Sequence, residues 1–255
     1  MGYQLKNVVD PILTTVFGVD KPKHGKSSQP HYDYRGTASY FIYKEFPFMV
    51  TAKHVLERKP QPGYLFHGKG VDAVFPLRSG WFASGDEELD IAVMGCFQNA
   101  LDEKSIIPFS YTHFLAPSFD HENALYYCNG YPGQNAMYMP FLGEFGISGN
   151  PFIAKAARLP DGFNSEKCFA VEYSSEIEPK GMSGAPIWNM RLHCLNSPET
   201  WSPEIASLAG IIHRWCPEEK VIIATRTEFL RDFIPDAIEH LKNKYRWKDG
   251  NDVYS

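Results

Sequence analysis

The 255-residue chain lacks several features that would decide its class at once. It has no apolar run long enough to cross a membrane, and Lys6 and Asp10 interrupt the apolar residues of segment 1–20, so we expect neither a membrane anchor nor a secretory signal. Position 6 is not the Ser or Thr that N-myristoylation at Gly2 requires. Repeats and low-complexity segments are also absent from the sequence. The expectation is a globular protein that binds no membrane.

The chain also contains few cysteines and has a small net charge. The chain has five cysteines, at positions 96, 128, 168, 194 and 216, and no two of them have the spacing of a metal-binding pair. This usage predicts reduced thiols in a cytoplasmic protein without metal or organic cofactor, each thiol acting as a small buried hydrophobic group. The net charge of −5 is mild and does not favour a nucleic-acid partner, which usually requires a clustered basic surface.

The many hydrophobic and aromatic residues of the chain, and their arrangement in short runs, predict β-structure. Hydrophobic residues make up 44% and aromatic residues 15% of the chain, enough for one large domain or two halves with a shared core. From Tyr34 onward, short aromatic and β-branched runs alternate with Gly and Pro. The strands expected from these runs are 38–43, 48–52, 64–67, 73–77, 91–96, 126–130, 146–153, 168–173, 185–188, 207–213 and 221–224. Such a series indicates a sandwich or a barrel, and periodicity alone does not choose between them.

The N-terminal region has a different pattern. Apolar residues in 5–17 have near-helical spacing, although Pro11 argues for a late start or a break. Segment 21–30 is polar and rich in Gly, Ser, Pro and Lys, and we expect an exposed loop there.

The C-terminal region predicts a helix over 226–245. Thr225 and Glu228 have the spacing of a capping box, and apolar residues follow them. Pro235 suits a first helical position, which would start a second helical stretch. The charged residues that follow Lys242 are expected to fray.

Three short motifs hold residues suited to nucleophilic catalysis. They are Thr-Ala-Lys-His-Val at 51–55, Leu-Asp-Ile-Ala-Val at 89–93 and Gly-Met-Ser-Gly-Ala-Pro at 181–186. A serine hydroxyl needs an imidazole to accept its proton, and the imidazole needs a carboxylate to fix its tautomer. His54, Asp90 and Ser183 supply these groups, in one of the three chain orders in which such triads recur.

A nucleophile elbow is the alternative setting for Ser183. That motif is G-x-S-x-G on a strand-to-helix turn, followed by the acid and the histidine, and Asp232 and His240 do follow. Ala185 breaks the motif, Pro186 leads into a strand, and no alternation of strands and helices precedes it, so this alternative is disfavoured.

The three motifs resemble the signatures of the chymotrypsin-like (trypsin-like) serine peptidases, which typically show T-A-x-H, D-I-A and G-D-S-G-G-P. The intervals also agree, because Asp90 lies 36 residues after His54 and Ser183 lies 93 residues after Asp90. The resemblance covers the chain from about Gly36 onward. It implies an all-β fold of two six-stranded antiparallel barrels with a cleft between them and a C-terminal helix.

The same resemblance implies an organisation and an activity. One peptidase domain would span 1–255, with an arm and loop at 1–30, a first barrel at about 34–115, a second at about 120–225, and the helix at 226–245. The activity would be that of a serine endopeptidase: Ser183 is the nucleophile, His54 the general acid and base, and Asp90 the group that orients His54. Backbone N–H groups of Gly181 and Ser183 would form the oxyanion hole.

The substrate pocket is less sharply indicated. The resemblance places Ile177 on the pocket floor with Glu178 beside it, and a wall strand contributes Ile211, Ile212 and His213. Ile177 on the floor would favour an apolar residue before the scissile bond, whereas Glu178 there would favour Lys or Arg. His213 either contacts the substrate or is an ordinary histidine at the end of a strand.

The sequence departs from the family pattern at several positions in and beside the three motifs, and one of these departures bears on regulation. Lys53 replaces a small residue, Ala185 replaces a Gly, and Val55 stands where a disulfide cysteine is common. Met182 replaces the Asp that pairs with the new N-terminus of secreted members after activation. The segment Gly130-Tyr131-Pro132-Gly133 resembles the G-Y-P-x-G motif of intracellular and HtrA-type members.

These departures leave two functions open. One is a peptidase that acts on protein or peptide substrates inside the cell and is restrained by the arm, by the loop at 21–30 or by a regulatory protein partner. Stress or defence against phage would be plausible settings. The other is a protease-like binding or scaffold module without turnover, which the residues beside the triad, Lys53 and Met182, favour. After the C-terminal helix the chain has no room for a PDZ domain of the HtrA kind.

Overall fold

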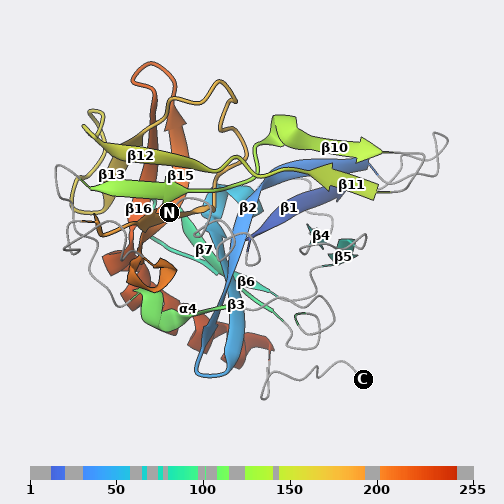
Figure 1. Cartoon of the computed structure of the whole chain (residues 1–255). Coiled ribbons are helices and arrows are strands. Elements are labelled where there is room, and N and C mark those ends of the chain that lie inside the picture. The colour runs from blue at the N-terminus through green and yellow to red at the C-terminus, as the bar shows by residue number, and fades with distance from the viewer. Residues whose placement is uncertain are drawn as a thin grey trace.

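The computed structural model describes residues 13–20, 31–57, 65–67, 74–76, 80–96, 101, 108–114, 124–139, 144–192 and 202–245. In this part of the chain most elements are strands, and one long helix follows them (Figure 1). The all-β expectation with a C-terminal helix is confirmed. None of the described helices is both long and apolar enough to cross a membrane.

The N-terminal half forms an eight-stranded sheet. Its strands are β1 (Leu13–Asp20), β2 (His31–Tyr43), β3 (Phe46–Ala52), β4 (Leu65–His67), β5 (Val74–Pro76), β6 (Trp81–Ala83), β7 (Ile91–Gly95) and β8 (Phe109–Ser110). Seven of them are ordered β5-β4-β1-β2-β3-β7-β6, and β8 pairs with β2 in parallel. Every residue of β3 and β7 is buried, which explains why both strands read as continuous apolar runs.

The C-terminal half forms a closed six-stranded barrel. Its strands are β9 (Leu125–Cys128), β12 (Phe152–Ala157), β13 (Cys168–Glu172), β14 (Pro186–Asn189), β15 (Ser207–Cys216) and β16 (Val221–Arg226). The closed order is β12-β13-β16-β15-β14-β9, so no barrel strand has an unpaired edge. Two further strands, β10 (Ala136–Met139) and β11 (Glu144–Ile147), pair with each other as a separate two-stranded sheet outside the barrel (Figure 1).

Helix α4 (Thr227–Tyr245) joins the two halves. Its buried apolar residues recur at helical spacing: Leu230, Ile234, Ala237, Ile238 and Leu241. They belong to one core cluster with side chains of β3 and β7 from the sheet and of β14 and β15 from the barrel. This shared core fixes the two halves relative to each other and therefore fixes the cleft between them.

Two local predictions near the N-terminus and in the barrel are wrong. Residues 13–17 lie in β1 rather than in a helix, because β1 pairs with β2 on one side and with β4 on the other. Residues 5–12 and the loop at 21–30 lie outside the described part. The single strand expected over 146–153 is instead the end of β11 and the start of β12, with the backbone of Asn150 bonded to Gly130 between them.

The details predicted for the C-terminal helix also change. Thr225 lies in β16, where its hydroxyl hydrogen-bonds to the carbonyl of Leu89, so it is not a helix cap. The helix begins at Thr227, whose hydroxyl donates to the carbonyl of Leu208 at 2.7 Å. Pro235 lies inside this one continuous helix and does not begin a second one. Tertiary contacts on both flanks of the junction override the local signals.

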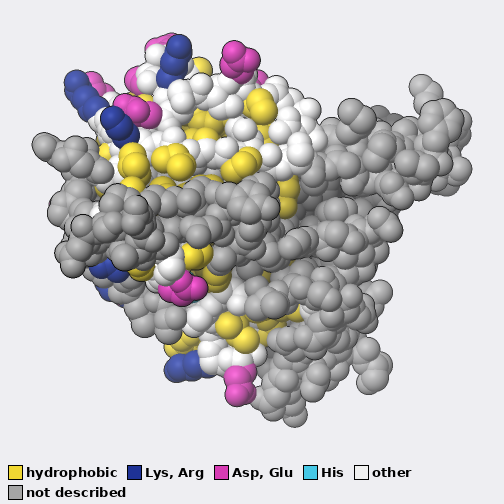
Figure 2. Space-filling view, in the orientation of Figure 1, with side chains coloured by type: hydrophobic (Ala, Val, Ile, Leu, Met, Phe, Trp, Pro, Cys, Tyr) yellow, Lys and Arg dark blue, Asp and Glu magenta, His cyan; other side chains and the backbone are white. Residues whose placement is uncertain are grey.

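The surface in Figure 2 carries charges of both signs. Acidic and basic side chains are interspersed on the described part of this face and are not gathered into a basic patch.

Candidate active site

Pairing of β3 with β7 brings His54 and Asp90 together. His54 lies in the short helix α2 (Lys53–Glu57) directly after β3, and Asp90 directly precedes β7. Ala52 is opposite Ile91 in the antiparallel register, so the end of one strand adjoins the start of the other. His54 Nδ1 lies 2.7 Å from Asp90 Oδ2, and the backbone N–H of His54 donates to Asp90 Oδ1 at 3.0 Å. A bidentate carboxylate thus fixes both the position and the ring orientation of His54.

The Asp90 carboxylate is kept ionised in a largely buried position. Its side chain is 15% exposed, and its backbone φ of 41° lies in the left-handed region, which aspartate tolerates better than most residues. Burial raises the pKa of Asp90, but the hydrogen bonds and charge of His54 lower it by more, with a smaller contribution from the nearby His213 ring. The net pKa is below its ordinary value. A carboxylate of this kind can stabilise an imidazolium beside it.

Ser183 lies on a tight turn that precedes β14. The backbone N–H of Met182 donates to the carbonyl of Pro179 at 2.9 Å, and Gly181 has φ of 102°. This combination is a type II turn with its glycine at the third position. The carbonyl of Lys180 accepts the N–H of Gly133 at 2.7 Å, so the N–H of Gly181 in the same trans peptide points the other way.

The turn presents two unused donors. Among the described residues, no protein group accepts the backbone N–H of Gly181 or of Ser183. Two such donors on one turn can bind an oxyanion.

Side chains and backbone of strand β2, in the first sheet, form hydrogen bonds to this turn. The hydroxyl of Tyr34 lies 2.8 Å from the carbonyl oxygen of Gly181 and also hydrogen-bonds to the carbonyl of Tyr131. Thr37 donates its hydroxyl to Gly181 at 3.1 Å and its N–H to the carbonyl of Ser183 at 2.8 Å. A Cβ on Gly181 would lie 2.3 Å from the Tyr34 ring, so only glycine fits there.

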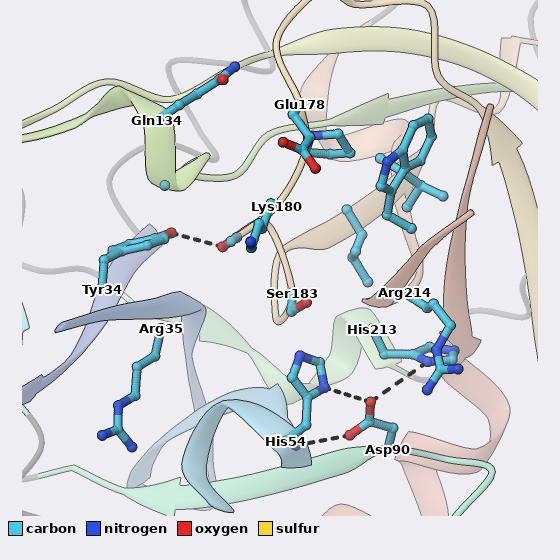
Figure 3. A pocket seen from close by; sticks show the side chains of 16 residues that line it. Tyr34, Arg35, His54, Asp90, Gln134, Glu178, Lys180, Ser183, His213 and Arg214 are labelled. Carbon is cyan, nitrogen blue, oxygen red and sulfur yellow. Dashed lines mark hydrogen bonds and ion pairs between the residues drawn. The ribbon is translucent and has the colours of Figure 1, made fainter. Parts of the chain in front are cut away.

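The three predicted catalytic residues line one cavity of about 660 Å³. In Figure 3, Ser183 lies above the imidazole of His54, and Asp90 lies on the far side of that ring. The described residues show no hydrogen bond between Ser183 and His54; such bonds are often loose in unliganded active sites. The geometry supplies a hydroxyl, an imidazole, a carboxylate and two backbone donors around one space.

The predicted pocket residues separate into two groups. Ile212, His213 and Glu178 line the cavity, with Glu178 exposed at its mouth. Ile211 does not: it is fully buried in the core shared with α4, since neighbouring residues of a strand point to opposite faces. Ile177 is not a lining residue either; its carbonyl accepts a hydrogen bond from the hydroxyl of Tyr173. Of the predicted pocket residues, Ile177 and Ile211 are therefore not among those that line this cavity.

Other lining residues were missed by sequence reasoning. Trp215 on β15 and Ile222 on β16 are paired in the barrel register, and both line the cavity. Lys180 and Arg214 add two cations near its rim. Only the pairing of β15 with β16 reveals Ile222, because no motif surrounds it in the sequence.

Two residues that depart from the family pattern have clear structural settings. Met182 is fully buried among the apolar side chains of the barrel, directly beneath the Ser183 turn. Lys53 is half-buried and forms an ion pair with Glu57 at 3.7 Å. Within the described ranges, no three His, Cys, Asp or Glu side chains gather in a way that could hold a metal ion.

Comparison with solved structures identifies the architecture. The HtrA-type protease AlgW, solved with a decapeptide, superposes with a TM-score of 0.61 at 14% sequence identity, over 94% of this chain and 68% of AlgW. A serine endoprotease from Yersinia pestis gives 0.57 at 13% identity, over 94% of this chain and 67% of that one. The serine protease domain of the Sesbania mosaic virus polyprotein gives 0.53 at 13%, over 88% and 92%.

The chain has the fold of the trypsin-like serine proteases. The predicted chymotrypsin-like double-barrel fold is confirmed, although the described residues close only the second barrel. No family model and no curated protein matches the sequence. At identities of 12–14% the likeness establishes the fold alone.

Proposed function

We propose that the protein is a serine endopeptidase with Ser183 as nucleophile, His54 as general acid and base, and Asp90 as the orienting carboxylate. The observation that carries the proposal is the cavity in which a carboxylate-bound imidazole faces a serine on a turn with two unused N–H donors. The protease fold of the structural neighbours supports the same class of reaction.

The reaction follows from the positions of these groups. Ser183 Oγ attacks the peptide carbonyl while His54 Nε2 accepts the hydroxyl proton, and Asp90 stabilises the resulting imidazolium through Nδ1. The oxyanion receives hydrogen bonds from the N–H groups of Gly181 and Ser183. His54 then protonates the leaving amine, and water hydrolyses the acyl-enzyme by the reverse sequence of proton transfers.

Covalent labelling of the intact chain tests this proposal. A fluorophosphonate probe is expected to modify Ser183 stoichiometrically, and Ser183→Ala is expected to remove both labelling and peptide hydrolysis, by roughly a million-fold in rate. Ser148→Ala is the matched control, since Ser148 is exposed and lies outside the cavity lining. Absence of labelling in the folded wild-type chain would reject the peptidase and favour a protease-like binding module.

For the substrate, we propose a preference for an apolar residue before the scissile bond. The inner wall of the cavity includes Ile212, Trp215 and Ile222, whereas the carboxylate of Glu178 is solvent-exposed at the mouth. Burial of an apolar side chain against such a wall contributes roughly 25 cal/mol per Å². Matched peptides with Leu, Phe, Arg or Gln at this position decide the question: a preference for Arg that disappears in Glu178→Ala would overturn it.

We further propose that the protein works in the cytoplasm and is restrained by a regulatory partner. Four described cysteines (Cys96, Cys128, Cys168 and Cys216) are free, which is consistent with a reducing compartment. Met182 is buried and apolar, so it cannot pair with a newly formed N-terminal amine. Full-rate casein degradation by the isolated chain would exclude restraint by a partner.

A further inference from the structure

The Asp90 carboxylate faces a second imidazole. His213, on β15, is only 4% exposed, and its Nδ1 lies 3.9 Å from Asp90 Oδ2 (Figure 3). The same oxygen binds His54 Nδ1 at 2.7 Å. Within the described chain, His213 Nδ1 has no hydrogen-bond partner. Burial of a polar atom without a hydrogen-bond partner costs free energy of folding. The position of His213 Nδ1 beside the Asp90 carboxylate therefore calls for a physical explanation.

The other ring nitrogen of His213 indicates which tautomer is present. His213 Nε2 lies 3.6 Å from Cys168 Sγ on β13. Burial raises the pKa of Cys168 to about 11, so this group remains a thiol and can donate its proton. Burial also lowers the pKa of His213 to about 4, against the opposing effect of Asp90, so the ring is neutral near pH 7 and carries one proton.

Electrostatics place that proton on Nδ1. If it were on Nε2, the bare lone pair of Nδ1 would face the Asp90 carboxylate in a buried setting, which is repulsive. With the proton on Nδ1, an N–H points at the carboxylate and the Cys168 thiol donates to Nε2. The other groups that act on His213 are His54 and Arg214, whose charges both oppose its protonation. The backbone carbonyl of Glu88, 3.8 Å from Cys168 Sγ, is a second acceptor within reach of the thiol proton, whereas His213 Nε2 lies closer to the sulfur, at 3.6 Å.

We propose that His213 is a positioning residue of the His54–Asp90–Ser183 site: its Nδ1–H faces Asp90 Oδ2 and holds the carboxylate toward His54, and the Cys168 thiol maintains this tautomer. The proposal rests on the proposed peptidase function. A separation of 3.9 Å is longer than a hydrogen bond, and we expect it to shorten when the cleft is occupied.

Nitrogen NMR of the full chain tests the tautomer without any need for activity. With ¹⁵N-labelled histidine, His213 is expected to show a protonated Nδ1 and an unprotonated Nε2 near pH 7. Assignment of the resonance uses the His213→Gln variant, in which it must disappear. A proton on Nε2 would overturn the proposal.

Two isosteric variants test the positioning role. The side-chain amide nitrogen of His213→Asn takes the place of Nδ1, whereas that of His213→Gln takes the place of Nε2. His213→Asn is expected to keep most of the wild-type kcat. His213→Gln is expected to lose roughly 10- to 100-fold in kcat with little change in KM, because the carboxylate that orients His54 is misplaced.

The pH profile separates this role from a merely structural one. In His213→Gln the low-pH limb of the rate is expected to move to lower pH, because a displaced Asp90 carboxylate stabilises the imidazolium of His54 less. The profile of His213→Asn is expected to stay at the wild-type position. Equal losses in both variants, or no loss in His213→Gln, would overturn the proposal. Melting temperatures establish that both variants are folded before their rates are compared.

A second pair of variants tests the thiol. Cys168→Ser keeps a donor toward His213 Nε2, and Cys168→Ala removes it, so only the alanine variant should resemble His213→Gln. Failure of the proposed function gives a different pattern: a wild-type chain that neither binds the fluorophosphonate nor cleaves peptides rejects the peptidase, and the NMR tautomer then decides the His213–Asp90 contact by itself.

Discussion

The two sides of the cleft are held in place by different kinds of interaction. On the Ser183 side, a buried Met182, a left-handed Gly181 and backbone hydrogen bonds fix the turn. On the Asp90 side, charged and polar side chains dominate: the carboxylate binds His54, and Lys167 on the barrel side forms ion pairs with the loop before Asp90.

This difference predicts how each side responds to substitution. Sterics and packing are nearly independent of pH and salt, whereas ion pairs depend on both. Damage on the Ser183 side should therefore persist in all buffers. Damage on the Asp90 side should vary with pH or ionic strength. The four variants below test this contrast, from the largest expected effect to the smallest.

Removal of the Asp90 charge has the largest expected effect. Asp90→Asn preserves the shape of the side chain, and kcat is expected to fall by roughly 10⁴-fold, since the amide favours the wrong tautomer of His54. Steady-state kinetics measure the loss, with circular dichroism as the control for folding. A kcat within tenfold of wild type would contradict the assigned role of Asp90.

The same variant changes the pH dependence of stability. Because the folded pKa of Asp90 lies below its ordinary value of 3.8, ionised Asp90 stabilises the fold above that pH. This contribution is lost as the pH falls from there through the lower folded pKa. Acid titration of the free energy of unfolding should therefore be steeper for the wild type than for Asp90→Asn between the two values.

A methyl group at the oxyanion turn should have the next largest effect. In Gly181→Ala the new Cβ would lie 2.3 Å from the Tyr34 ring and 2.9 Å from the backbone nitrogen of Gly133, at a φ of 102°. We expect kcat to fall by roughly 10²- to 10³-fold as the N–H donors move, at every pH tested.

Gly162→Ala is the matched control for this variant. Gly162 also has a positive φ, 90°, but nothing lies within 4 Å of the position of a new Cβ. It shares the left-handed strain and lacks the steric conflict. Similar losses of kcat in the two variants would show that the crowded turn is not the cause.

Substitution of the buried anchor beneath the turn should reduce stability. Met182→Ala leaves a cavity among the apolar side chains of the barrel, and the free energy of unfolding is expected to fall by about 2–5 kcal/mol at every pH tested. Met182→Leu conserves volume and polarity and should cost less than about 1.5 kcal/mol. Urea denaturation compares the two. Equal stabilities would mean that Met182 does not anchor the turn.

The smallest effect is expected from the exposed ion pairs on the Asp90 side. Lys167 Nζ lies 2.7 Å from a carboxylate oxygen of Asp86 and 2.6 Å from one of Glu88, and hydrogen bonding to Lys167 lowers the pKa of Asp86. Lys167→Met should reduce the melting temperature slightly at low salt and scarcely at all at high salt.

Lys155→Met serves as the control for Lys167→Met. Lys155 is an exposed lysine of β12 in the same barrel, so the two variants lose the same charge. A salt-independent loss in Lys167→Met, or an equal loss in the control, would contradict an electrostatic role for Lys167.

Much of the fold could be predicted from local patterns. Short apolar runs indicated most strands, because a buried strand must be apolar along its length or on alternate positions. Near-helical spacing at 13–17 was misleading, since hydrogen bonds to β2 and β4 make that segment a strand. Local preference is weak compared with a full set of backbone hydrogen bonds to neighbouring strands.

The sequence by itself determined which residues could be catalytic, because His54, Asp90 and Ser183 stand in short motifs whose order and spacing are unusual. Only the tertiary structure decided their surroundings. The register of β15 against β16 brings Ile222 into the cavity, the alternation of side chains turns Ile211 into the core, and β15 places the ring of His213 beside Asp90. These outcomes depend on contacts between strands far apart in the chain, and no local pattern records such contacts.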